Sequence, residues 1–141
     1  MDGPVTGPHQ ILNPDSLAAP VGFSHAVVAA QGRTVYLGGQ AGHDSAGRIV
    51  GPGMAEQFRQ AASNVSVALD AAGGKPEHIV SMQIYVTDVA AYRDSLSLIG
   101  DSYRDVFGRH YPATALFGVV ELFDPEAKVE LVCTAVIPEN S

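Results

Sequence analysis

The chain has few of the residues that stabilise small secreted or metal-binding domains. Its 141 residues include one cysteine, Cys133, and no tryptophan. A single cysteine cannot form an internal disulfide or a cysteine-based zinc site. No apolar run approaches the ~18 residues that a membrane-spanning helix needs. The start, Met1-Asp2-Gly3-Pro4, lacks the basic and apolar regions of a signal peptide. We therefore expect a cytoplasmic globular protein that does not contact membranes.

Basic residues are also scarce. Eight Lys and Arg stand against fifteen Asp and Glu, which gives a formal net charge of −7. Phosphate backbones are bound by clustered Lys and Arg, so this balance argues against nucleic acid as the main ligand. Charged residues make up only 16% of the chain, where about a quarter is usual. We expect a partner subunit to cover part of the surface.

Glycine, proline and the period of the apolar residues divide the chain into elements. Residues 1–22 show no period and are expected to form a flexible N-terminal arm, and residues 23–141 a single domain. A period of two predicts strands, and apolar residues every three or four positions predict helices. The predicted elements are strands at 25–30 and 34–38, joined as a β-hairpin, a helix at 54–72, a strand at 79–87, a helix at 88–107, and strands at 113–121 and 127–137.

The resulting order is ββαβαββ, which is typical of an α+β fold: a mixed sheet with two helices on one face. Gly73-Gly74 is expected to end the first helix, and Asp88 to cap the second. The opposite face of the sheet carries polar and mixed residues, and no helix remains to cover it. Self-association would cover that face.

Glu130 is the first candidate for chemistry. It lies in the run Lys128-Val129-Glu130-Leu131-Val132-Cys133. Burying an unpaired carboxylate is costly. The residues alone leave two interpretations open. Either the strand face that carries Glu130 is exposed to solvent, or Glu130 is a general acid/base or water-orienting group in a cleft between subunits.

The glycine-rich segment Gly38-Gly39-Gln40-Ala41-Gly42 is the second candidate. Backbone N–H groups at such a strand end can hold an anion, although the residues alone favour a turn that needs glycine. It lacks the GxGxxG order of a nucleotide site. We expect Cys133 to be a buried structural thiol. His25, His43 and His110 lack the spacing of metal ligands, so no metal site is predicted.

Several short segments, in this order and spacing, resemble the RidA family, also called YjgF-like or L-PSP proteins. The similarity runs from about Pro20 to Ile137. The matching segments are Gly22-Phe23-Ser24-His25-Ala26, Val35-Tyr36-Leu37-Gly38-Gly39-Gln40, Glu56-Gln57 with Gln60 and Asn64, Val80 to Asp88, Tyr103 with Phe107, His110-Tyr111-Pro112-Ala113-Thr114, and Val129-Glu130-Leu131.

This resemblance implies a homotrimer with a chorismate-mutase-like fold and small-molecule clefts between subunits. It implies hydrolysis of enamine or imine intermediates, such as 2-aminoacrylate, to 2-oxo acids and ammonia, with no cofactor. Glu130 would be the catalytic residue that orients water. Gly39 and Gln40 would supply backbone donors. The cleft walls would be formed by Phe23, Tyr103, Thr114 and Phe117.

The chain also departs from the family pattern. Thr114 stands where active members carry the arginine that binds the substrate carboxylate, Phe23 where they carry a tyrosine, and Gly38 where they carry a serine. A charged hydrogen bond contributes about 1.5–3 kcal/mol, so carboxylate capture should weaken by roughly ten- to more than a hundredfold unless Arg109 or His110 reaches the cleft. A threonine beside apolar walls favours a neutral or less polar ligand.

Three functions follow as alternatives. The protein is an imine or enamine deaminase with altered substrate specificity, a non-catalytic trimeric module that binds a small metabolite, or an endoribonuclease, as an older family name suggests. The net charge of −7 disfavours the last.

Overall fold

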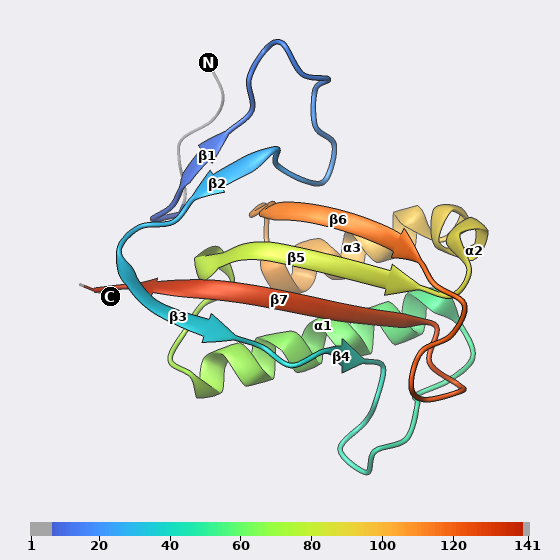
Figure 1. The fold of residues 1–141 in the computed structure, drawn as a ribbon. Coiled ribbons are helices and arrows are strands. Elements are labelled where there is room, and N and C mark those ends of the chain that lie inside the picture. Colours follow the sequence, from blue (N-terminus) through green and yellow to red (C-terminus); the bar gives the residue numbers. More distant parts are fainter. Residues whose placement is uncertain (1–6, 140–141) are drawn as a thin grey trace.

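The structure is a computed structural model that describes residues 7–139 (Figure 1). The start of the chain, discussed above as lacking a signal peptide, lies outside the described residues. In chain order the elements are β1 (Gln10–Leu12), β2 (Ala26–Val28), β3 (Gly32–Tyr36), β4 (Gln40–Ala41), α1 (Met54–Ala71), the 3-10 helix η1 (Pro76–His78), β5 (Ile79–Val86), α2 (Val89–Asp94), α3 (Leu96–Phe107), β6 (Ala113–Gly118) and β7 (Val129–Pro138).

Five strands form one mixed sheet. Its order is β3-β7-β5-β6, and β4 also pairs with β7. The strands β5 and β6 run parallel, whereas β7 is antiparallel to β3, β4 and β5. The helices lie on one side of this sheet (Figure 1). The predicted fold class, α+β with a mixed sheet and helices on one face, is confirmed.

The core lies between α1 and the sheet. Phe58, Ala61, Val65 and Leu69 of α1 are at most 1% exposed, as the predicted helix face requires. The helix begins where the Gly53 N–H donates to Glu56 Oε1 at 2.8 Å. It ends before Gly73, whose φ of 83° is the left-handed conformation that glycine accepts without strain. On the sheet side the core contains Val129, Leu131, Cys133 and Ala135 of β7 with Ile79, Met82 and Val86 of β5.

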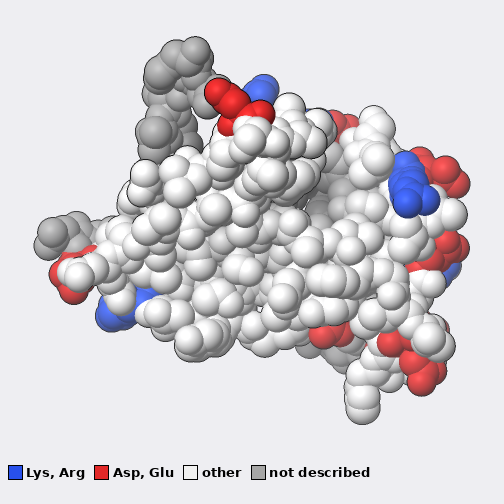
Figure 2. Space-filling model, turned by 45° about the horizontal axis from the view of Figure 1, so that its top comes forward, with Lys and Arg blue, Asp and Glu red and all other residues white. Residues whose placement is uncertain are grey.

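The other face of the sheet carries no helix. Because side chains alternate along a strand, Glu130 and Val132 point to this side while their neighbours are buried. Nearby, the rings of Tyr85 and Phe117 stack with centroids 5.5 Å apart, and Tyr36 is 82% exposed. Figure 2 shows that the broad surface in its centre is almost free of Lys, Arg, Asp and Glu, which gather at the margins. Depletion of charged residues is typical of the core of an interface between proteins.

The predicted β-hairpin between residues 25–30 and 34–38 is wrong. Strands form near both positions, but β2 pairs with β1 and β3 pairs with β7. In the register Val27 lies opposite Ile11, and Val35 lies opposite Ala135. The apolar period shows that a segment is extended. It does not show which strand becomes its partner, because pairing depends on tertiary packing.

Part of the expected N-terminal arm has regular structure. Within residues 7–22, the described part of that segment, β1 pairs with β2. His9, next to β1, is 2% exposed, and its Nε2 lies 3.1 Å from both His78 O and Val136 O. The ring Nδ1 accepts a hydrogen bond from the Ala30 N–H at 3.0 Å. These bonds hold the segment against the sheet.

The helix expected at 88–107 is divided in two. Asp88 caps α2 as predicted, because its Oδ1 accepts the Ala91 N–H at 3.0 Å. At Ser95 the chain leaves the α2 path and starts α3. The Ser95 Oγ donates to Ala91 O at 2.8 Å, a side-chain hydrogen bond that bends helices. Gly108, with φ of 68°, ends α3 at the predicted residue.

Candidate functional site

Glu130 lines a cavity of about 420 Å³. Glu130 reaches it because it follows Val129 and precedes Leu131, which are both 0% exposed and turned to the core. The cavity is therefore built on the rigid central strand of the sheet. Its walls are Gly39, Gln40, Ala41, His43, Phe123, Asp124, Pro125, Ala127 and Glu130.

Gly39 makes room for the carboxylate. A Cβ added at Gly39 would collide with Glu130 Oε2 and crowd the rest of the carboxyl group. The glycine-rich segment therefore has a steric role at this site, beyond the turn that it forms. Gln40 follows in β4, lines the same cavity, and donates from Nε2 to Gly38 O at 3.3 Å. Glu130, Gly39 and Gln40 lie together, as the resemblance implies.

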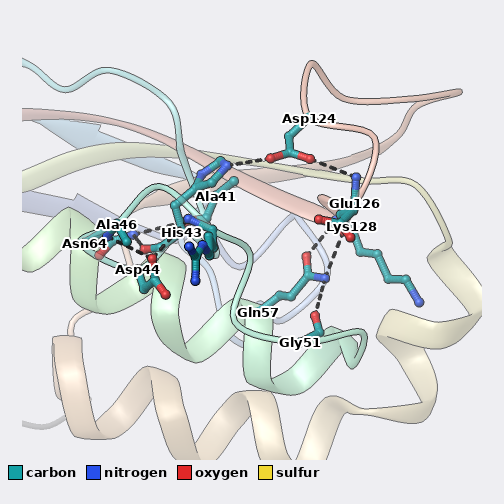
Figure 3. Close-up of polar contacts among 11 residues, drawn as sticks. Ala41, His43, Asp44, Ala46, Gly51, Gln57, Asn64, Asp124, Glu126 and Lys128 are labelled. Carbon is teal, nitrogen blue, oxygen red and sulfur yellow. Dashed lines mark hydrogen bonds and ion pairs between the residues drawn. The ribbon is translucent and has the colours of Figure 1, made fainter.

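His43 and Asp124 form a pair in the same cavity that was not expected from the sequence. His43 Nε2 lies 2.9 Å from Asp124 Oδ2 (Figure 3). The Glu126 N–H and the His43 ring both hydrogen-bond to Asp124 and lower the pKa of its carboxyl group. Asp124 is therefore ionised at neutral pH and accepts the Nε2–H of His43. The two residues are 81 positions apart, so no local spacing could have revealed the pair.

Two amides on α1 hold the loops that carry this pair (Figure 3). Asn64 Nδ2 donates to Ala41 O at 3.1 Å and to His43 O at 2.9 Å. Gln57 is 0% exposed. Its Nε2 donates to Gly51 O at 2.8 Å and Glu126 O at 3.1 Å, and its Oε1 accepts the Lys128 N–H at 2.7 Å. These bonds fix both rims of the cavity to the core helix.

Three of the four expected wall residues, Phe23, Tyr103 and Thr114, lie around a separate cavity of about 590 Å³, between β6, the helices α2 and α3, and the segment before β2. Thr114 Oγ1 donates to Pro112 O at 2.8 Å. Tyr103 donates its hydroxyl to His110 O at 2.6 Å, and burial raises its pKa. The lining residues are Val21, Gly22, Phe23, Ile84, Tyr92, Leu96, Ile99, Gly100, Tyr103, Arg104, Tyr111, Thr114, Ala115 and Leu116.

The two cavities share no lining residue. Within one chain the structure brings Glu130, Gly39 and Gln40 together and, separately, Phe23, Tyr103 and Thr114. Phe117 lines neither cavity and stacks on Tyr85 on the open sheet face.

Neither Arg109 nor His110, the two residues considered from the sequence, lines the cavity that contains Thr114. His110 is buried, with Nε2 2.7 Å from Ile79 O. Arg109 lines a shallow depression beside Pro76 and Glu77 instead. The guanidinium that does line the cavity with Thr114 belongs to Arg104, on α3. Its position one turn after Gly100 is the sequence signal that could have revealed it.

Two general features of the described residues bear on function. No helix within residues 7–139 is long and apolar enough to cross a membrane. The same residues contain no group of three or more His, Cys, Asp or Glu side chains arranged to hold a metal ion.

Comparisons with known proteins agree with this geometry. The family model described as endoribonuclease L-PSP matches residues 14–137. The bovine protein named 2-iminobutanoate/2-iminopropanoate deaminase is 32% identical over 129 residues, covering 90% of this chain and 89% of its own. A RutC family protein of Aquifex aeolicus is 34% identical over 115 residues, with 80% and 89% covered.

Solved structures show the same fold. A Rid family protein of unknown function from Yersinia pestis, YyfB, superposes with a TM-score of 0.83 at 29% identity, covering 92% of this chain and 98% of that one. RidA from an Antarctic Psychrobacter gives a TM-score of 0.65 at 27% identity, with 91% and 99% covered. Fold and site define a protein of the YjgF-like class. The chain belongs to the RidA (L-PSP) family.

Proposed function

We propose that the protein is a hydrolase that converts an imine or enamine to a carbonyl compound and ammonia, in a cleft completed by a second subunit. One observation carries this proposal: a strand carboxylate, Glu130, faces a cavity beside a glycine whose missing side chain makes room for it. The deaminase name of the bovine relative supports the reaction type.

A homotrimer accounts for the division of the site. The resemblance implies a cleft with residues of both groups, yet one chain places them in separate cavities. Glu130 also lies on the sheet face without a helix, in register with Tyr85, whose ring stacks on that of Phe117. If that face packs against a neighbouring subunit, the Glu130 cavity of one chain adjoins the Thr114 cavity of the next.

The reaction needs water and proton transfers. Glu130 accepts a proton from the attacking water as the water oxygen bonds to the imine carbon, and the nitrogen takes up a proton to give a carbinolamine. The carbonyl then forms as the hydroxyl loses its proton and the C–N bond breaks, and the nitrogen leaves as ammonia. His43, whose Nε2–H is held by Asp124 in the same cavity, is the candidate group that takes the hydroxyl proton at Nδ1 and passes it to the leaving nitrogen.

The test is turnover by purified protein of imines generated in situ from amino acids by an oxidase. Glu130→Gln removes the base and should lower kcat by about 10²–10⁴-fold. Glu121→Gln is the matched control, because Glu121 is exposed and lies outside both cavities. Absence of turnover by the unmodified protein, or equal turnover by the Glu130→Gln variant, would contradict the proposal.

A non-catalytic metabolite-binding module is the second candidate. Phe23 and Thr114, at the positions that carry a tyrosine and an arginine in active members, favour it. In that case a screen of small metabolites would find one that raises the thermal midpoint, and no ammonia would be released. Ribonuclease activity is disfavoured by the net charge of −7.

A further inference from the structure

The cavity beside α3 has mainly carbon walls. Its volume of about 590 Å³ exceeds the 420 Å³ around Glu130. It lies in the range of sites that take whole small molecules, roughly 300–1,000 Å³. Aromatic and aliphatic side chains make up most of the lining: Phe23, Tyr92, Tyr103, Tyr111, Ile84, Ile99, Leu96 and Leu116.

The polar groups in these walls are largely engaged by the protein. The Tyr103 hydroxyl is bonded to His110 O, and the ring of Tyr103 lies flat on Tyr111 with centroids 5.2 Å apart. The Thr114 hydroxyl is bonded to Pro112 O. Burial raises the pKa of Tyr92 to about 12, so this phenol is neutral at physiological pH. A ligand therefore meets an apolar surface over most of the cavity.

Arg104 supplies positive charge at the edge of this surface. Among the described residues that line the cavity, it is the only one with a charged side chain. Gly100 lies directly beside it: a Cβ there would be 3.3 Å from Arg104 Nη1, so the guanidinium would have to shift by a few tenths of an ångström. Arg104 Nη2 donates a hydrogen bond to Asp101 Oδ1 at 2.7 Å. This bond orients the guanidinium group and uses one of its five N–H donors.

We infer that this cavity binds an organic carboxylate with a bulky apolar or aromatic group, and that Arg104 pairs with the carboxylate. If the protein is the deaminase proposed above, on which this extension rests, its substrates are 2-imino acids with large apolar side chains. A small acid leaves most of the wall uncovered, and each additional buried methylene strengthens binding by roughly fourfold. Because Asp101 already places one negative charge beside Arg104, we expect a ligand with a single negative charge to bind more tightly than one with two.

The first experiment measures binding to the full-length protein by calorimetry with three probes: 3-phenylpropanoate, propanoate and 3-phenylpropanamide. The first pair differs only in the phenyl group, and the first and third differ only in charge. We expect 3-phenylpropanoate to bind at least tenfold more tightly than either of the others. Equal affinity for the acid and the amide, or for the two acids, would overturn the inference.

The second experiment assigns the charge to Arg104. Arg104→Gln should reduce the affinity for 3-phenylpropanoate by about tenfold or more and leave the amide unchanged. Arg109→Gln is the matched control, because Arg109 lies next to the end of α3 but outside the cavity. An equal effect of both variants on binding of the acid would contradict the assignment.

Failure of the inference is distinguishable from failure of the proposed function. Arg104-dependent binding of the aromatic acid without turnover of any imine would support the ligand class and refute the deaminase. Turnover of the alanine-derived imine that equals or exceeds that of the phenylalanine-derived imine, with no preference among the binding probes, would support the deaminase and refute the ligand class.

Discussion

Mild acid should destabilise this protein, because histidines are buried beside η1. His78 and His110 are 4% and 7% exposed. Burial lowers the pKa of both, and the neighbouring His9 lowers both further. The Lys75 N–H donates to His78 Nδ1 at 3.0 Å, a bond that only the neutral ring accepts. Glu77 opposes the shift of both histidines, and the bond from His110 to Ile79 O opposes that of His110.

The sign of the effect follows from proton uptake. A histidine near pKa 6.5 in the unfolded chain and lower in the folded chain binds more protons when unfolded. The free energy of unfolding therefore falls as pH drops below 6.5, until the folded-state pKa is reached. The loss is about 1.4 kcal/mol per pH unit for each such group. The total loss for each histidine is therefore about 1.4 kcal/mol for every pH unit by which its pKa in the folded chain lies below 6.5.

Urea unfolding followed by far-UV circular dichroism at pH 7.5, 6.5 and 5.5, at one protein concentration, measures this loss. The double variant His78→Gln/His110→Gln should show a weaker dependence of the free energy of unfolding on pH. His25→Gln, which lies away from these buried histidines, should leave that dependence unchanged. Should the double variant fail to fold, nuclear magnetic resonance of the imidazole protons in the unmodified protein provides the same test. An unchanged free energy of unfolding down to pH 5.5, or titration of both buried rings near 6.5, would refute the reasoning.

Other outcomes follow from single side chains. Gly39→Ala should displace the Glu130 carboxylate and lower turnover as Glu130→Gln does, and an unchanged crystal structure around Glu130 would contradict this. Asn64→Ala removes two hydrogen bonds to the loop at Ala41 and His43, so the free energy of unfolding in urea should fall by about 1–3 kcal/mol; a change below measurement error would count against that role. Burial raises the pKa of Cys133 to about 12, and the residue is 1% exposed, so maleimide should label it only in denaturant; rapid labelling of the folded protein would disprove this.

Local patterns in the sequence predicted much of the fold. The apolar spacing located α1 to within a residue at its C-terminal end, and Gly73 and Gly108 end their helices as expected. Alternation around Glu130 indicated that it leaves the core on a strand. These features depend on backbone and side-chain preferences within a few residues, which a single sequence displays directly.

Contacts between distant segments were not predictable in the same way. The partners of β2 and β3, the His43–Asp124 pair and the entry of Arg104 into a cavity each join or orient segments by packing. All the expected site residues except Phe117 also fall into two groups, although the resemblance placed them in one cleft. Their separation reflects which sides of a single folded chain they occupy.

The order of residues alone determined that this chain forms an α+β sheet protein with a carboxylate on an otherwise apolar strand, because helix and strand periods and glycine stops act locally. Tertiary structure decided which strands pair. It also decided that Gly39 leaves room for the Glu130 carboxylate, and that His43 and Asp124 form a hydrogen bond in the same cavity. Those outcomes depend on close packing between segments far apart in the chain, and only the folded molecule brings these together.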